Sequence, residues 1–92
     1  MVLMGVLRLR REGLLWSEVG DEAVLLDITS ATYFTATGAG PFLLAHLAGG
    51  ATEESLAQRL MEQYEVAPDA AKADVAEFIE QLKAHHMLEN TA

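Results

Sequence analysis

The sequence predicts an α+β fold in which a three-stranded antiparallel sheet is followed by three helices. Two observations support this class. Residues 1 to about 36 hold short apolar and β-branched runs separated by turn residues, which is typical of strands. Residues 38 to 88 instead repeat apolar side chains at helical spacing. The chain of 92 residues is long enough for one domain with a modest core.

Three runs, residues 14–19, 23–28 and 32–35, are the predicted strands of a meander. The middle run is almost continuously apolar, and the last, Thr-Tyr-Phe-Thr, is β-branched and aromatic, which suits a pleated surface. The intervening Gly-Asp-Glu and Thr-Ser-Ala segments are the expected turns. Residues 6–10 alternate apolar and basic side chains, so we expect residues 1–12 to form either an N-terminal arm or an edge strand.

Three helices are predicted after the glycine-rich break at residues 38–40. Pro41 suits the first position of the first helix, and a Gly-Gly pair ends it. Thr52 is the expected N-cap of the second helix, with two glutamates in its first turn. Pro68 opens the third, whose apolar face consists of Ala71, Val75, Phe78, Ile79 and Leu82. The helical part has the dimensions of a helix-turn-helix and the sheet those of its wing, so we expect a winged helix-turn-helix.

The composition is that of a folded domain. Hydrophobic residues make up 51% of the chain and charged residues 22%, which is globular rather than disordered composition. Cysteine is absent, which excludes disulfides, thiolate metal sites and cysteine nucleophiles and fits a reducing compartment. Arg8, Arg10 and Arg11 follow a short apolar run, the reverse of a signal peptide, and no apolar run approaches the roughly 20 residues of a membrane helix. We therefore expect a cytoplasmic protein with no membrane partner.

The formal net charge of −8 argues against nucleic acid as a partner. Fourteen carboxylates face six Lys and Arg residues. Three of those cations lie in the N-terminal arm, and Arg59, Lys72 and Lys83 are spread over the helical segments. A duplex-binding surface needs clustered cations that displace counterions from phosphates. The acidic excess is instead interpreted as a solubility feature.

No arrangement typical of catalysis occurs in the sequence. His85 and His86 are neighbours whose side chains diverge by about 100° on a helix, and His46 is isolated, so no histidine pair has the spacing of a helical metal site. Gly38 and Gly40 precede a helix but no lysine follows them, which makes the likeness to a phosphate loop weak. We therefore expect a protein that is not an enzyme and that uses no cofactor and no metal.

Tyr33 and Phe34 are adjacent on the last predicted strand and must point to opposite faces of the sheet. We expect one ring to enter the core and the other either to lie against the third helix or to remain partly exposed. The alternation does not decide which ring takes which position.

The order of segments along the chain resembles that of PqqD-like domains. The matching segments are Ala-Val-Leu-Leu-Asp-Ile at 23–28, Tyr33-Phe34, Thr37-Gly38-Ala39, Thr-Glu-Glu-Ser-Leu-Ala at 52–57, Glu-Val-Ala-Pro-Asp at 65–69, Ala-Asp-Val at 73–75 and Phe-Ile-Glu-Gln-Leu at 78–82. The resemblance covers about residues 14 to 89, and the ordered set carries it rather than any single motif. Two positions depart from the family pattern: Thr35-Ala36 replaces a frequent Leu-Asn, and Ala67 replaces a polar cap.

The resemblance implies a recognition element of pathways that modify ribosomally synthesised peptides (a RiPP recognition element), with residues 13–90 as a single peptide-binding domain. Such domains bind the leader segment of a precursor peptide as an antiparallel strand added to the third strand, in a groove lined by the third helix. A stand-alone chain of this size is most similar to the split leader-binding subunit of lasso peptide biosynthesis, whose partner is a cysteine-protease-type leader peptidase. The alternatives are a peptide chaperone for a radical enzyme in another peptide-modification pathway and, less favoured, a winged-helix DNA-binding protein. Weak self-association through the sheet edge is a further alternative.

The peptide-binding residues that we expect lie on and just before the last strand and on the third helix. They are Ala31, Thr32, Tyr33, Phe34, Thr35, Ala36, Asp74, Val75, Phe78, Ile79, Leu82, Lys83 and His86. About five backbone hydrogen bonds at about 1 kcal/mol each do not reach the roughly 8 kcal/mol of micromolar binding, because association itself costs at least about 4 kcal/mol. Apolar leader side chains must therefore be buried in the groove, at about 2–3 kcal/mol each.

Overall fold

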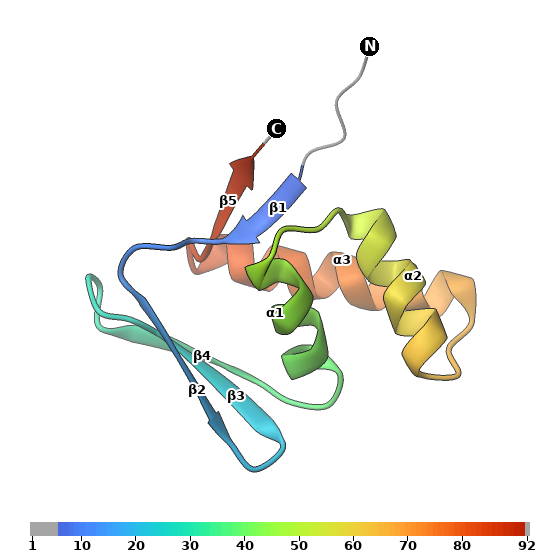
Figure 1. Cartoon of the computed structure of the whole chain (residues 1–92), viewed down its shortest axis with the longest axis horizontal. Helices are drawn as coiled ribbons and strands as arrows, with labels where there is room; N and C mark the ends of the chain where they lie inside the picture. Colours follow the sequence, from blue (N-terminus) through green and yellow to red (C-terminus); the bar gives the residue numbers. More distant parts are fainter. Residues whose placement is uncertain (1–5, 92) are drawn as a thin grey trace.

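The computed structural model describes residues 6–91 and confirms the predicted α+β architecture (Figure 1). The elements in chain order are β1 (Val6–Leu9), β2 (Leu14–Val19), β3 (Glu22–Asp27), β4 (Thr32–Ala36), α1 (Gly40–Ala48), α2 (Glu53–Gln63), α3 (Pro68–Ala84) and β5 (Leu88–Thr91). Strands β2, β3 and β4 form an antiparallel sheet in that order, and the three helices follow it in the chain. The prediction that helical structure extends to residue 88 is wrong, because α3 ends at Ala84 and a strand follows.

The sheet is a meander with short turns. Gly20 has a φ of 61° at the first position of the two-residue β2–β3 turn, where a type II′ turn favours glycine. A longer connection joins β3 to β4, and there the Asp27 carboxylate accepts hydrogen bonds from the backbone N–H groups of Thr29 and Ser30. The register aligns Leu15, Leu26 and Tyr33 in one row across the three strands. Because β4 ends the strand order, no strand among residues 6–91 pairs with its second edge.

Strand β1 belongs to a second, two-stranded sheet with β5 (Figure 1). The two strands pair antiparallel from Val6↔Thr91 to Leu9↔Leu88. Leu7 and Leu9 are buried, and the backbone of Leu7 also exchanges two hydrogen bonds with Ala51, at 2.7 and 2.8 Å. Residues 1–12 were expected to form either an arm or an edge strand. The structure shows a strand over Val6–Leu9, while residues 1–5 lie outside the described residues.

The core lies between the inner face of the three-stranded sheet and the helices. Its largest fully buried side chains are Leu25, Leu44, Leu47, Leu56, Val75, Ile79, Leu82 and Met87. Thr52 caps α2 as predicted: its side chain accepts a hydrogen bond from the Ser55 N–H, and the Ser55 hydroxyl accepts one from the Thr52 N–H. Helix α3 begins at Pro68 with no side-chain cap from Ala67. Within residues 6–91 no helix has the length and apolar character needed to span a bilayer.

Candidate functional site

The backbone groups that face the free edge of β4 follow from the hydrogen-bond alternation of the sheet. The N–H of Ile28 donates to the carbonyl of Gly13 at 2.9 Å, in register with the β2–β3 pairing. Because hydrogen-bonded and non-bonded pairs alternate along antiparallel strands, the N–H and C=O groups of successive β3 residues face β2 and β4 in turn. The same alternation turns the N–H and C=O groups of Phe34 toward β3. The corresponding groups of Tyr33 and Thr35 therefore point to the free edge.

The side chains of β4 alternate in the same way and decide the question left open for the two aromatic residues. Phe34 and Ala36 are buried, at 9% and 3% exposure, whereas the Tyr33 side chain is 67% exposed. Phe34 therefore enters the core and faces α3, and Tyr33 lies on the outer face of the sheet. This assignment means that β4 offers an apolar inner face and an accessible backbone edge at the same residues.

A groove of about 610 Å³ lies beside this edge. Its lining comes from β4, the β4–α1 loop, α3 and the ends of α1 and α2, and consists of Phe34, Thr35, Ala36, Thr37, Gly38, Ala39, Gly40, Leu43, Leu60, Tyr64, Val66, Asp74, Glu77, Phe78 and Gln81. The inner face of β4 thus continues directly into the groove. A peptide strand that pairs with β4 would lie along it, with alternate side chains directed inward.

Phe34 and Phe78 form much of the apolar floor of the groove. Their rings meet edge to face with centroids 5.9 Å apart, and the His85 ring packs on Phe34 at 5.4 Å. Where the chain turns from β4 into α1, a Cβ atom at Gly40 would lie 2.8 Å from the Cβ of Ala36. Ala36 and Gly40 therefore allow the start of α1 to approach the strand closely, although the Leu-Asn pair of the family is missing at this corner.

The structure brings five of the predicted site residues together in the groove: Phe34, Thr35, Ala36, Asp74 and Phe78. Three others on α3, Val75, Ile79 and Leu82, are buried at 1% exposure or less and pack in the core. The remaining five, Ala31, Thr32, Tyr33, Lys83 and His86, are exposed and do not line the groove. The α3 side chains that face the groove are instead those at 74, 77, 78 and 81, a stripe beside the core-facing one.

Sequence reasoning missed Glu77, Gln81, Tyr64 and Val66, together with most of the β4–α1 loop. The i, i+3, i+4, i+7 spacing that starts at Asp74 was a signal for the two residues on α3. This spacing did not stand out in the sequence, because three of its four side chains are polar, as they are on a solvent-exposed helix face. Tyr64 and Val66 lie after α2, and no periodicity marks their approach to the groove.

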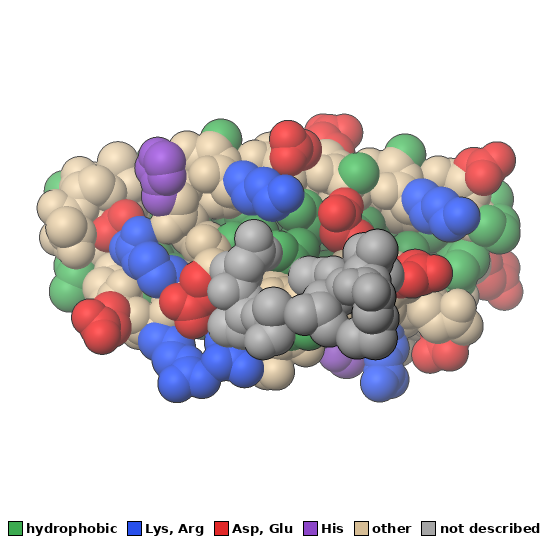
Figure 2. Space-filling model, turned by 90° about the horizontal axis from the view of Figure 1, so that it is seen from above, with side chains coloured by type: hydrophobic (Ala, Val, Ile, Leu, Met, Phe, Trp, Pro, Cys, Tyr) green, Lys and Arg blue, Asp and Glu red, His purple; other side chains and the backbone are tan. Residues whose placement is uncertain are grey.

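The groove carries negative charge. Asp74 and Glu77 are the charged residues among its lining, and no Lys or Arg lines it within the described part of the chain. Figure 2 shows Lys and Arg side chains set among Asp and Glu on the face seen from above, the side on which both chain ends lie in Figure 1. The described residues hold no group of three His, Asp or Glu side chains close enough to bind a metal ion. The groove lining offers backbone hydrogen-bonding groups, apolar side chains and two carboxylates that attract cations.

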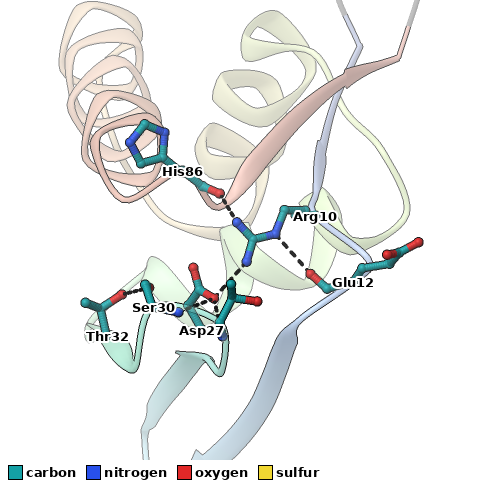
Figure 3. A network of polar contacts seen from close by, with 7 residues as sticks. Arg10, Glu12, Asp27, Ser30, Thr32 and His86 are labelled. Atoms are coloured by element: carbon teal, nitrogen blue, oxygen red, sulfur yellow. Dashed lines mark hydrogen bonds and ion pairs between the residues drawn. The ribbon is translucent and has the colours of Figure 1, made fainter.

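A polar network fixes the loop before β4 relative to the end of α3 (Figure 3). The Arg10 guanidinium lies 3.0 Å from the Asp27 carboxylate and donates to the carbonyls of Glu12 and His86, at 3.0 and 2.7 Å. Asp27 is almost fully buried. The Arg10 guanidinium holds the pKa of the Asp27 carboxyl below its ordinary value of 3.8; backbone N–H groups act in the same direction, and burial opposes them. The network therefore holds β4 and α3, the two walls of the groove, through residues that do not themselves line the groove.

The outer face of the three-stranded sheet lies on the side away from the helices (Figure 1) and carries exposed apolar side chains. Leu15, Leu26 and Tyr33 form a row across the strands and are 55%, 37% and 67% exposed. Val19 and Ile28 add exposed apolar side chains on β2 and directly after β3. Such a cluster on a small domain is typical of a surface that contacts another protein. Tyr33 joins it to the free edge of β4.

A family model described as coenzyme PQQ synthesis protein D (PqqD) matches residues 22–88. The chain belongs to the PqqD family. The match includes β3, β4 and all three helices, the elements that build the free edge and the groove. No curated protein matches this PqqD-family chain by sequence.

Two solved structures share the fold of this PqqD-family chain. The structure of TbiB1 in complex with the TbiA(beta) leader peptide is similar with a TM-score of 0.81 and 24% identity, over 92% of this chain and 98% of that one. The structure of lasso peptide synthetase B1 complexed with the leader peptide is similar with a TM-score of 0.78 and 28% identity, over 90% of this chain and 96% of that one. The fold with its two small sheets is therefore that of proteins solved with a bound peptide.

Proposed function

We propose that this PqqD-family chain is a non-catalytic, cytoplasmic subunit of lasso peptide biosynthesis. It binds the leader segment of a ribosomal precursor peptide as a strand added to β4 and delivers it to a separate cysteine-protease-type leader peptidase. The observation that carries the proposal is the free edge of β4 beside an apolar groove, with the backbone of Tyr33 and Thr35 turned outward. The bound leader peptides of the two similar structures support it.

Strand addition fixes how a leader meets this site. In an antiparallel pair, directly opposed side chains lie on the same face of the sheet. Leader residues opposite Phe34 and Ala36 therefore point into the groove, onto the floor that Phe78 completes. Leader residues opposite Tyr33 and Thr35 point to the outer face. The leader thus needs apolar anchors at every second position and carries its other side chains on the opposite face.

The free energy of binding must come largely from these anchors. The outward backbone groups of Tyr33 and Thr35 offer two N–H and two C=O groups, which is about 4 kcal/mol at about 1 kcal/mol per hydrogen bond. That roughly offsets the association cost of at least about 4 kcal/mol. Micromolar affinity, about 8 kcal/mol, then requires about three buried apolar side chains at about 2–3 kcal/mol each. A groove of about 610 Å³ has room for side chains of that size.

The outer face of the sheet is the surface that we assign to the peptidase. The exposed row of Leu15, Leu26 and Tyr33 is apolar and uncovered, and Tyr33 makes it continuous with the edge to which the leader adds. A leader strand would extend this face by one strand, so the peptidase would contact domain and leader together. Substituting Leu15 and Val19, which are exposed on β2 away from the β4 edge, by Ser should reduce leader cleavage by the peptidase while leader binding stays within about threefold.

The test of leader binding uses proline as a probe of the free edge. Proline at Thr35 removes an outward N–H without removing a bond to β3, because edge strands tolerate proline at such positions. Glu18→Pro is the matched control, since the same alternation turns the N–H of Glu18 away from β3 at the opposite edge of the sheet. The probes are fluorescein-labelled synthetic leaders of the small precursor-like reading frames encoded beside this chain's gene.

We expect one labelled leader to bind the whole chain saturably at tens of micromolar or below in fluorescence anisotropy. Thr35→Pro should weaken that binding by at least about tenfold, and Glu18→Pro should change it by less than about threefold. Circular dichroism checks that both variants keep the native secondary structure. The proposal fails if no leader binds, or if the two proline variants lose affinity equally.

A further inference from the structure

The two carboxylates of the groove lie on one stripe of α3. Asp74 and Glu77 are three residues apart, so their side chains project from the same face of the helix. Both are exposed, and neither forms an ion pair with any residue in the described range 6–91. Like charges at this spacing disfavour a helix slightly. The groove therefore holds two uncompensated carboxylates next to its apolar floor.

The position of these carboxylates along β4 follows from the contacts of α3. The His85 ring packs on Phe34, and Phe78 contacts Phe34 and lies 3.4 Å from where a Cβ of Gly40 would be. Moving from His85 toward the start of α3 therefore leads along the groove toward the end of β4 that enters α1. Glu77 adjoins Phe78, and Asp74 lies about 4.5 Å beyond Glu77 in that direction, at about 1.5 Å per residue.

We propose that the bound leader carries a Lys or Arg whose charged group binds between Asp74 and Glu77. This inference rests on the proposed function, because it names the chemistry of the peptide that the same groove selects. A peptide antiparallel to β4 begins at the Ala36 end, so this basic residue lies at the N-terminal end of the paired segment. The leader that this groove selects thus has apolar residues at every second position of the paired strand and a Lys or Arg residue before them.

Physical chemistry favours this pairing over an ordinary surface ion pair. The aliphatic part of a Lys or Arg side chain packs on apolar surface such as Phe78 and Leu43, while its charged end reaches the carboxylates at the rim. Bound peptide also removes water from one side of the pair, which strengthens the attraction compared with an open surface. The net charge of −8 adds a long-range attraction for a cationic peptide.

The experiment selects peptides without assuming a client. A displayed library of random 20-residue peptides is selected on the whole wild-type chain, and binders that lose affinity for the Thr35→Pro variant are kept as groove binders. We expect Lys or Arg enrichment at one position N-terminal to the apolar alternation. Selection on the Asp74→Lys, Glu77→Lys double variant should replace that preference by Asp or Glu. Groove binders without a basic preference at any fixed position would overturn the inference.

A measured affinity then tests the contact directly. For a selected peptide, the Asp74→Asn, Glu77→Gln double variant should bind about 3- to 10-fold more weakly, and a peptide with its basic residue replaced by Met should show no such difference. Glu18→Gln, Glu80→Gln is the matched control, because it removes the same charge outside the groove lining. An equal loss of affinity in the control variant would overturn the proposed contact between the basic residue of the peptide and the two carboxylates. If every selected peptide is insensitive to Thr35→Pro, the proposed function itself fails, which is a separate outcome.

Discussion

The guanidinium of Arg10 lies 3.0 Å from the carboxylate of Asp27, and the same guanidinium donates to the carbonyl of His86. Arg10 directly follows β1, Asp27 ends β3, and His86 lies just beyond α3. One side chain thus connects both sheets with the helix that lines the groove (Figure 3). The Asp27 carboxylate in turn holds the N–H groups of Thr29 and Ser30 in the loop that leads into β4.

Loss of Arg10 should therefore destabilise the fold. Arg10→Leu leaves the Asp27 carboxylate buried without its cation and the His86 carbonyl without its donor. We expect the midpoint of thermal unfolding, followed by circular dichroism, to fall by several degrees. Arg11→Leu is the matched control, because Arg11 is exposed and adjacent. The Arg10→Leu, Asp27→Asn double variant should lower the unfolding midpoint by less than the sum of the two single variants. Strict additivity of the two decreases would mean that the residues are not coupled.

The same ion pair predicts how stability depends on pH. The pKa of the Asp27 carboxyl is lowered in the folded state, chiefly by Arg10, so the folded state favours the ionised form. This contribution to stability is present above the unfolded pKa of about 3.8 and is lost as pH falls through the lower folded value. Urea unfolding between pH 7 and pH 2 should show wild type more stable than Asp27→Asn at neutral pH, with the difference shrinking below about pH 4. The exposed Asp21→Asn variant should instead follow wild type across the range.

The three-stranded sheet was predictable because its signals are local. The predicted strand at 14–19 matches β2, and those at 23–28 and 32–35 differ from β3 and β4 by one residue at their ends. Each run has a short apolar or β-branched pattern and a turn beside it. Strand β5 was not predictable in this way, because Leu-Glu-Asn-Thr is short and lacks alternation. It exists through pairing with β1, from the other end of the chain, and sequence periodicity carries no information on such pairing.

The groove was predictable only in outline. Periodicity identified the apolar side of α3, but it does not distinguish residues that pack under the sheet from those that face beyond its edge. Val75, Ile79 and Leu82 belong to the first group, and Phe78 lies at the border between the two. Contacts between distant segments, such as Phe34 with Phe78, make that distinction. The ion pair between Arg10 and Asp27 was not predicted, for the same reason.

The close approach of Ala36 and Gly40 makes a steric prediction. In Gly40→Ala the new Cβ would lie 2.8 Å from the Cβ of Ala36, so β4 and α1 must separate. We expect a loss of about 1–3 kcal/mol in the free energy of unfolding, measured with urea, and weaker leader binding. Gly49→Ala is the control, because its nearest neighbour would be 3.9 Å away, and it should be neutral or slightly stabilising. The Ala36→Gly, Gly40→Ala variant should recover part of the loss; no recovery would place the clash elsewhere.

The end of α3 makes the opposite prediction, a gain in stability. His86 adopts a φ of 57°, and the N–H groups of His86 and Met87 donate to the carbonyls of Lys83 and Leu82, which is a Schellman motif. Glycine is preferred at this left-handed position, where other residues are strained by about 1–2 kcal/mol. Because the His86 side chain is exposed and its carbonyl still accepts from Arg10, His86→Gly should raise the free energy of unfolding by about 0.5–1 kcal/mol. His85→Gly should lower it, since φ is −92° there and the ring contact with Phe34 is lost. A His86→Gly variant as unstable as His85→Gly would show that the imidazole of His86, rather than its backbone, stabilises the end of the helix.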